Sequence, residues 1–130
     1  MPSIRDVERY IGRRYDADSF DCADLAVLIQ DELFGRHVQL PGGRGRRQAP
    51  TATLERYRAD LATEISRDEI EPGDVLLMKG EVLHIGTLFF VGGCWRVLHN
   101  SYRLGGVWLH KLSELSSYGL RVEGFYRWKF

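Results

Sequence analysis

A change of hydrophobic period at Pro72-Gly73 divides the sequence into a helical part and a strand part. Before this point, apolar residues recur at the three- and four-residue spacing of amphipathic helices. After it, they form short runs separated by glycine-containing turns, as is typical of strands. Helices followed by strands predict an α+β fold with N-terminal helices packed on a mainly antiparallel sheet. No composition break interrupts the 130 residues, so we expect a single domain over 1–130.

Two helices have clear start and stop signals in the N-terminal part. Ser3 and Asp6 have the spacing of a capping box, which predicts a short helix beginning after Ser3. A second helix is expected to begin at about Cys22, with Asp21 as its N-cap. Gly35 is expected to end it, because glycine readily adopts the left-handed conformation that closes a helix.

The remaining elements are predicted from hydrophobic period and turn residues. A third helix is expected over Thr53–Ile65, where apolar residues recur on one helical face. The strands that follow are separated by pairs that contain glycine. The predicted strands are Asp74–Met78, Leu83–Val91, Cys94–Asn100 and Leu120–Trp128, with a short fifth strand at Val107–Leu109.

Charge, hydropathy and cysteine content exclude several classes of protein. Eighteen basic residues balance 18 acidic ones, which argues against a nucleic-acid binder. No apolar run reaches the roughly 20 residues that a membrane span needs, and the first residues lack the apolar core of a secretory signal, so we expect synthesis in the cytoplasm. Two cysteines without zinc-ligand spacing do not indicate a disulfide framework or a metal site. We therefore expect no metal and no organic cofactor.

Cys22 is the candidate nucleophile of the chain. It lies where an acidic loop enters a helix, and the N-terminal end of a helix stabilises a thiolate through its backbone N–H groups and dipole. Asp16, Asp18 and Asp21 oppose this effect, so a paired imidazolium is expected to matter more. The alternative interpretation is that Cys22 is simply a small buried hydrophobic residue.

A glycine pair sets the expected register of a hairpin. Gly92-Gly93 between two strands is typical of a two-residue turn. A turn centred there pairs Val91 with Cys94, and counting back along both strands places Gly86 opposite His99. Because successive strand residues alternate between faces, His84 shares a face with His99.

The register predicts a histidine pair next to the helix start. His84 and His99 are diagonal neighbours close enough for one hydrogen bond between their rings, whereas Asn100 points to the other face. We expect the face of the two histidines to pack against the helices, with Cys22 meeting them at its open end. The two other histidines, His37 and His110, are expected in loops or turns and are assigned no role.

Three segments resemble the NlpC/P60 family of cell-wall cysteine peptidases. Phe20–Val27 resembles the motif of the family's nucleophile. Pro72–Met78 followed by His84-Ile85-Gly86 is similar to the strand pair that carries the base. Val97–Asn100 is similar to the strand that carries the third, orienting residue. The order and spacing match over about residues 12–100.

The resemblance implies a papain-like fold and a function. It implies cleavage of peptidoglycan stem peptides near D-γ-glutamyl and diaminopimelyl residues. In this family pattern Cys22 is the nucleophile, His84 the base and His99 the residue that holds the His84 ring. Tyr15 is similar to the family's upstream tyrosine, and we place Tyr15 and Asp21 in the oxyanion or substrate region.

Other segments are most similar to phage tail-associated members of the family. They are Gly12–Tyr15, Phe20–Cys22 and Glu32–Gly35 through Leu40-Pro41. The expected partners are stem peptides and phage tail proteins, and the expected place of action is the cell wall, reached from a virion tail. Ala23-Asp24 stands where the family usually has Ser-Gly or Ala-Gly, so the amine contact made there by some members is not carried over.

Three alternatives remain open at this point. The chain can be a non-enzymatic structural part of a tail tip that keeps the fold. It can be an amidase or acyltransferase that uses the same thiol on another acyl group. The basic loop with Arg44, Arg46 and Arg47 can either contact anionic wall polymers or simply be solvated.

Overall fold

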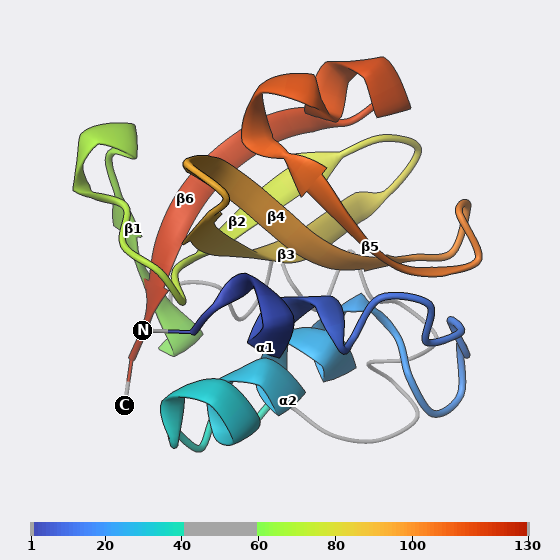
Figure 1. Ribbon diagram of the computed structural model, residues 1–130, viewed down its shortest axis with the longest axis horizontal. Coiled ribbons are helices and arrows are strands. Elements are labelled where there is room, and N and C mark those ends of the chain that lie inside the picture. Colours follow the sequence, from blue (N-terminus) through green and yellow to red (C-terminus); the bar gives the residue numbers. More distant parts are fainter. Residues whose placement is uncertain (1, 41–59, 130) are drawn as a thin grey trace.

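The protein is an α+β structure built on one antiparallel sheet (Figure 1). The computed structural model describes residues 2–40 and 60–129. Six strands lie in the order β1-β6-β2-β3-β4-β5, and each neighbouring pair is antiparallel. The predicted α+β class and antiparallel sheet are therefore confirmed. The strands are β1 (Ala62–Ile65), β2 (Val75–Lys79), β3 (Leu83–Val91), β4 (Cys94–Ser101), β5 (Gly106–Lys111) and β6 (Arg121–Trp128).

Both predicted helix starts are confirmed by their caps. Helix α1 (Ile4–Glu8) follows Ser3, and helix α2 (Cys22–Phe34) follows Asp21. At α2, Asp21 Oδ1 accepts from the Asp24 N–H at 3.0 Å, and Asp24 Oδ2 accepts from the Asp21 N–H at 2.9 Å. This reciprocal capping box satisfies backbone groups that a helix start leaves without partners. Two 3₁₀ helices complete the fold, η1 (Arg67–Glu69) and η2 (Leu112–Tyr118).

The prediction of a third helix over Thr53–Ile65 is wrong at its C-terminal end. Residues 62–65 form strand β1, in which Ala62 pairs with Trp128 and Ile65 with Phe125. Pairing with the edge of β6 outweighs the local helical pattern, since strand formation depends strongly on tertiary context. The other residues of the predicted helix up to residue 59, and the basic loop with Arg44, Arg46 and Arg47, lie outside the described residues.

The two faces of the sheet are covered by different elements. Helices α1 and α2 lie on one side, and η2 lies on the other (Figure 1). On the α-helical side, Leu25 and Ile29 of α2 pack with Phe89 and Leu98 of the sheet. On the side of η2, the apolar cluster consists of Leu76, Met78, Leu88, Val97, Leu112, Leu115 and Phe125.

This arrangement corrects the expected packing of the histidine face. Leu88 and Val97, which share a face with His84 and His99, pack against η2 and not against α1 or α2. The prediction that the helices cover this face is therefore wrong. A short 3₁₀ helix after β5 covers it instead, and its serine-rich sequence carries no amphipathic pattern long enough to reveal this.

The segment before α2 is attached to the edge of the sheet. The Gly12 N–H donates to Val107 O at 3.1 Å, the Val107 N–H donates to Arg13 O at 2.9 Å, and the Tyr15 N–H donates to Gly105 O at 3.1 Å. Gly106 allows this approach, because a Cβ there would collide with the carbonyl oxygen of Arg13. The segment therefore places Tyr15 next to the β4–β5 loop.

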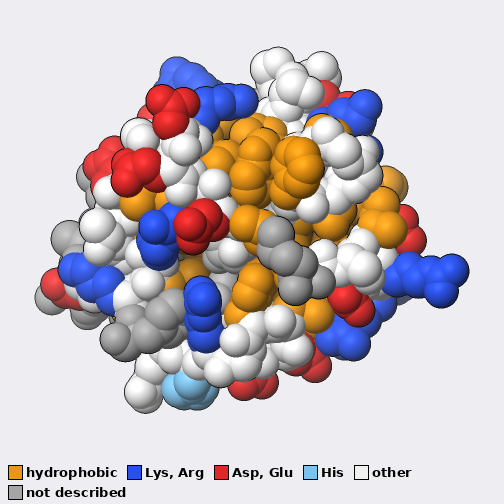
Figure 2. Space-filling view, turned by 60° about the vertical axis from the view of Figure 1, so that its left-hand side comes forward, with side chains coloured by type: hydrophobic (Ala, Val, Ile, Leu, Met, Phe, Trp, Pro, Cys, Tyr) orange, Lys and Arg blue, Asp and Glu red, His pale blue; other side chains and the backbone are white. Residues whose placement is uncertain are grey.

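The surface carries charges of both signs. On the face that Figure 2 shows, basic and acidic side chains are interspersed around an area of hydrophobic side chains. A nucleic-acid binder would present a surface dominated by basic residues. Among the described residues, no helix combines the length and the apolar character that crossing a bilayer requires.

The cap of α2 gives a first prediction. Replacing Asp21 with alanine removes the acceptor for the Asp24 N–H, and we expect the free energy of unfolding to fall by about 1 kcal/mol. Asp21→Asn should lose less, since asparagine is also a good N-cap. Urea denaturation checks both variants against Asp18→Ala, which removes an exposed acid of the same loop. Equal stability of Asp21→Ala and Asp18→Ala would contradict a stabilising cap.

Candidate active site

A cavity of about 300 Å³ lies where α2, the β2–β3 turn, the β4–β5 loop and the end of η2 meet. Cys22, His84 and Tyr15 all line it. The structure thus brings three of the predicted site residues to one cavity. The other lining residues are Gly80, Glu81, Val82, Leu83, Ser101, Tyr102, Arg103, Leu104, Tyr118, Gly119 and Leu120.

Cys22 occupies the first position of α2, as predicted. Its side chain is 7% exposed and packs with Leu83 and Ile85 at the start of β3. The helix that follows is 13 residues long, so its aligned peptide dipoles place partial positive charge at this end. Negative charge on the sulfur is therefore favoured by position, although burial of the thiol opposes it.

Asn100 fixes the loop that precedes the cysteine. Its Nδ2 donates to Phe20 O at 2.8 Å and to Asp21 O at 3.2 Å, and its side chain is fully buried. These bonds attach the N-terminal end of α2 to β4. The sequence placed Asn100 on the face away from His84 but gave it no function. A buried asparagine beside a helix start is the signal that would have suggested this positioning role.

His84 and His99 form the predicted ring pair. A hydrogen bond of 2.8 Å joins His84 Nε2 to His99 Nδ1, and the ring planes are 74° apart. Gly86 pairs with His99 as the hairpin count requires. Because Nε2 of His84 is used in this bond, Nδ1 is the ring nitrogen left for base chemistry.

The backbone at Gly86 is closely packed. Val97 occupies it, since a Cβ on Gly86 would lie 2.5 Å from Val97 Cγ1 and 2.9 Å from Met78 Cε. Glycine at this position therefore permits close packing of three strands below the histidines. It does not provide an open volume for the His99 ring.

A third histidine, for which the sequence predicts no role, extends the pair. His110 is in β5 and not in a loop, because β5 continues to Lys111. His99 Nε2 and His110 Nδ1 are 2.9 Å apart, and both side chains are buried. In the part of the chain that is described, no three His, Cys, Asp or Glu side chains are grouped to hold a metal ion. The histidines instead form a chain of hydrogen bonds.

Burial keeps these three rings neutral. Desolvation lowers the pKa of His84 to about 4. Desolvation, followed by the nearby His84 and His110, lowers the pKa of His99 to about 2. The pKa of His110 is also lowered by burial, against a smaller opposing effect of Glu114. At neutral pH, His84 is therefore in the unprotonated form that a general base requires.

Tyr15 contributes a hydroxyl group to the cavity. Burial, and then the negative charges of Cys22, Asp21 and Asp24, raise the pKa of Tyr15 to about 12. Its ring contacts that of Tyr102 edge to face, with the centroids 5.5 Å apart. The phenol therefore stays protonated at neutral pH and remains a hydrogen-bond donor.

Asp21 and Asp24 are structural residues of the helix start. Asp21 is 2% exposed, and neither it nor Asp24 lines the cavity. Both carboxylates take part in the capping box of α2. The acid at position 24, unusual for the resembled family, is therefore used for capping and does not reduce the volume beside Cys22.

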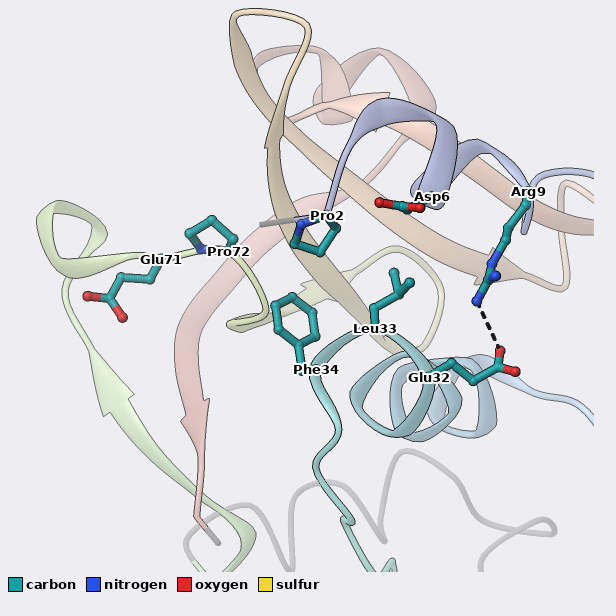
Figure 3. A pocket seen from close by; sticks show the side chains of 8 residues that line it. All are labelled: Pro2, Asp6, Arg9, Glu32, Leu33, Phe34, Glu71 and Pro72. Carbon is teal, nitrogen blue, oxygen red and sulfur yellow. Dashed lines mark ion pairs between the residues drawn. The ribbon is translucent and has the colours of Figure 1, made fainter.

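A larger and more open groove of about 820 Å³ lies elsewhere, along α1 and the end of α2 (Figure 3). Its lining residues include no cysteine and no histidine. Glu32 pairs with Arg9 at 3.9 Å and accepts from the Tyr10 hydroxyl at 2.8 Å, while Asp6 belongs to the cap of α1. The smaller cavity, which combines a thiol with a base, is the better candidate for catalysis.

The buried histidines give a prediction on stability and pH. Unfolded histidines bind protons near pH 6.5, whereas the pKa of folded His84 is about 4. Below pH 6.5 the unfolded state therefore binds more protons. The free energy of unfolding should fall as the pH falls, by up to about 1.4 kcal/mol per pH unit for each such histidine.

Urea denaturation between pH 6.5 and 5 measures this slope. His84→Asn removes one titrating group and should give a shallower slope. Identical slopes in the wild type and His84→Asn would show that His84 is not held neutral by burial.

The comparisons with known proteins add no relative to this geometry. No family model matches the chain, and a search of curated proteins finds no match either. The assignment of the site therefore depends on the motifs of the sequence and on the arrangement of Cys22, His84, His99 and Tyr15.

Proposed function

We propose that the chain is a cysteine peptidase of the NlpC/P60 type, with a papain-like fold, that hydrolyses peptidoglycan stem peptides from a phage tail. One observation carries the proposal. The first residue of α2 is a cysteine, and it shares a cavity with a histidine whose other ring nitrogen is bonded to a buried second histidine. A thiol, a base and a group that orients the base are the parts that nucleophilic acyl transfer needs.

Acylation uses these three residues in order. His84 Nδ1 removes the proton from Cys22 Sγ, and the thiolate attacks the amide carbonyl carbon to form a C–S bond. The carbonyl electron pair moves to oxygen, and the Tyr15 hydroxyl and the N-terminal end of α2 stabilise this oxyanion. When the C–N bond breaks, the proton on His84 passes to the leaving amine.

Deacylation regenerates the thiol. His84 Nδ1 takes a proton from water, and the hydroxide attacks the thioester carbonyl. The C–S bond breaks, the acid product leaves, and the proton returns to Cys22. Throughout, His99 holds the His84 ring through Nε2, so that the same nitrogen faces the sulfur in each step.

Two charged side chains of the cavity wall favour a peptide substrate that itself carries charged groups. Glu81 and Arg103 are exposed side chains of opposite sign on its rim. A stem peptide contains both free amines and free carboxylates, for which such a pair provides partners. Together with the family resemblance, this favours a stem peptide over a neutral polypeptide.

A second candidate function is supported by the apolar part of the same wall. Val82, Leu83, Leu104 and Leu120 line it together with the rings of Tyr102 and Tyr118. These side chains suit an acyl group with an apolar portion. The second candidate is therefore an amidase or acyltransferase that forms the same thioester at Cys22.

Thiol reactivity gives a test that needs no substrate. We expect Cys22 to be alkylated by iodoacetamide with an apparent pKa below the ordinary thiol value of about 8.5, because the helix start stabilises the thiolate and neutral His84 can accept the thiol proton. Cys94 is at the far end of the hairpin and serves as the internal control. Mass spectrometry of the two cysteine peptides across a pH series gives both profiles.

The His84→Asn variant gives the pH profile of Cys22 alkylation in the absence of the proposed base. Its Cys22 profile should shift toward that of Cys94. Absolute rates do not decide the matter, since Cys22 is the more buried thiol. Parallel profiles for both cysteines in the wild type would contradict an activated pair.

Digestion of purified sacculi tests the proposed reaction. The wild type should release peptide fragments whose ends, read by mass spectrometry, identify the bond that is cut. Cys22→Ala and His84→Ala should both abolish release, because nucleophile and base act as a unit. His99→Ala should keep residual activity, since an orienting group contributes less.

Cys94→Ala is the matched control and should digest sacculi like the wild type. A folded wild type that leaves several wall chemotypes intact but cleaves a small acyl amide favours the amidase alternative. No activity on either substrate, together with infectious Cys22→Ala particles, favours a structural part of the tail.

A further inference from the structure

His99 is hydrogen-bonded through both of its ring nitrogens. Its Nδ1 is 2.8 Å from His84 Nε2, and its Nε2 is 2.9 Å from His110 Nδ1. The side chain of His99 is fully buried, and that of His110 is 5% exposed. The hydrogen bonds among these three histidines therefore determine which ring nitrogens carry a proton.

Neutral rings in such a chain have two possible proton arrangements. A neutral imidazole has one N–H, and each nitrogen-to-nitrogen bond needs one donor and one acceptor. In the outward arrangement, His84 donates to His99 and His99 donates to His110. In the inward arrangement, every bond is reversed, and His84 then carries its proton on Nδ1.

Only the outward arrangement leaves His84 competent as a base. There the proton of His84 is on Nε2, and Nδ1 offers a lone pair toward the cavity. In the inward arrangement, Nδ1 is a donor and cannot accept the proton of Cys22. A ring with the wrong tautomer loses most of its catalytic contribution even when its position is unchanged.

The surroundings of His110 hold its ring in place and bear on its proton. The Tyr118 ring of η2 stacks on it, with the centroids 3.8 Å apart and the planes 18° apart, and Trp108 lies parallel at 6.1 Å. Glu114 of η2 is the acid that acts on it electrostatically, and His99 faces it from β4. The negative charge of Glu114 makes the His110 ring more basic, and a more basic ring is the better acceptor for a hydrogen bond from His99.

We propose that His110 is a positioning residue, which accepts the proton of His99 Nε2–H and thereby holds His84 in the tautomer with a free lone pair on Nδ1. The proposal rests on the proposed function of Cys22 and His84 and extends it by one residue. No proton has to travel along the chain during the reaction. When His84 gains its second proton at Nδ1, it continues to donate Nε2–H to His99.

Two variants at position 110 separate this role from packing. His110→Phe keeps a ring that can stack on Tyr118 but removes the acceptor. His110→Asn loses the stack but keeps an acceptor, since its Oδ1 can lie near the former Nδ1. We expect the Phe variant to lose roughly 10²-fold in kcat, the lower range for general-base catalysis, with KM little changed. The Asn variant should keep the greater part of kcat.

Histidine ¹⁵N NMR gives a readout that needs no substrate. In the wild type at pH 7, His84 should have its proton on Nε2. In His110→Phe it should have its proton on Nδ1, and the pH profile of Cys22 alkylation should differ from that of the wild type, because Nδ1 then faces the sulfur as a donor and not as an acceptor. His110→Asn should resemble the wild type in both measurements, and circular dichroism verifies that each variant is folded.

The outcomes distinguish this proposal from the one on which it rests. A wild-type His84 protonated on Nδ1 overturns the proposal even if the Phe variant does not fold. An unchanged tautomer and alkylation profile in a folded Phe variant also overturns it, while hydrolysis by the wild type still supports the Cys22 site. If the tautomer switches but the wild type hydrolyses no wall peptide, the role of His110 is supported and the proposed peptidase function is contradicted.

Discussion

The turn at Gly92-Gly93 decides which side of the sheet each residue of β4 faces. Both glycines have positive φ, 63° and 80°, and the turn pairs Val91 with Cys94. Side chains alternate along a strand, so a slip of one residue would exchange the faces of His99 and Asn100. His99 would then lose His84, and Asn100 would lose the loop before α2. The site depends on this register more than on any single contact within it.

The two halves of the site come from opposite faces of the sheet. Cys22 packs with Leu83 on the side of α2, whereas His84, the next residue of β3, points to the side of η2. Both line the same cavity, which lies at the first residues of β3 beside the β2–β3 turn. The helix start provides electrostatic support for the sulfur, and the opposite face provides the buried chain of histidines. Cys22 belongs to the apolar cluster with Leu83 and Ile85, and a separate cluster with Leu88, Val97 and η2 lies on the face of the histidines.

Sequence signals that depend on only a few neighbouring residues predicted part of the site. The capping residues of α2 and the glycine turn gave the position of Cys22 and the His84–His99 pair, because both follow from spacing along the chain. The partner of His99 in β5 could not be found in this way. It depends on how far β5 extends and on its pairing with β4, in which Trp108 lies opposite His99. The covering of the histidine face by η2 and the pairing of β1 with β6 are likewise set by contacts between distant segments.

A direct observation of the acyl-enzyme tests the central claim, that Cys22 and His84 act as nucleophile and base. The protein is mixed with sacculi or with the stem peptides released from them, and the reaction is quenched with acid within one turnover. The protein is then digested, and the masses of its peptides are measured by mass spectrometry. We predict that the peptide containing Cys22 gains the mass of a stem-peptide acyl fragment in the wild type and not in His84→Ala. Hydrolysis of the wall without any adduct, or with Cys22 replaced by alanine, would contradict the account.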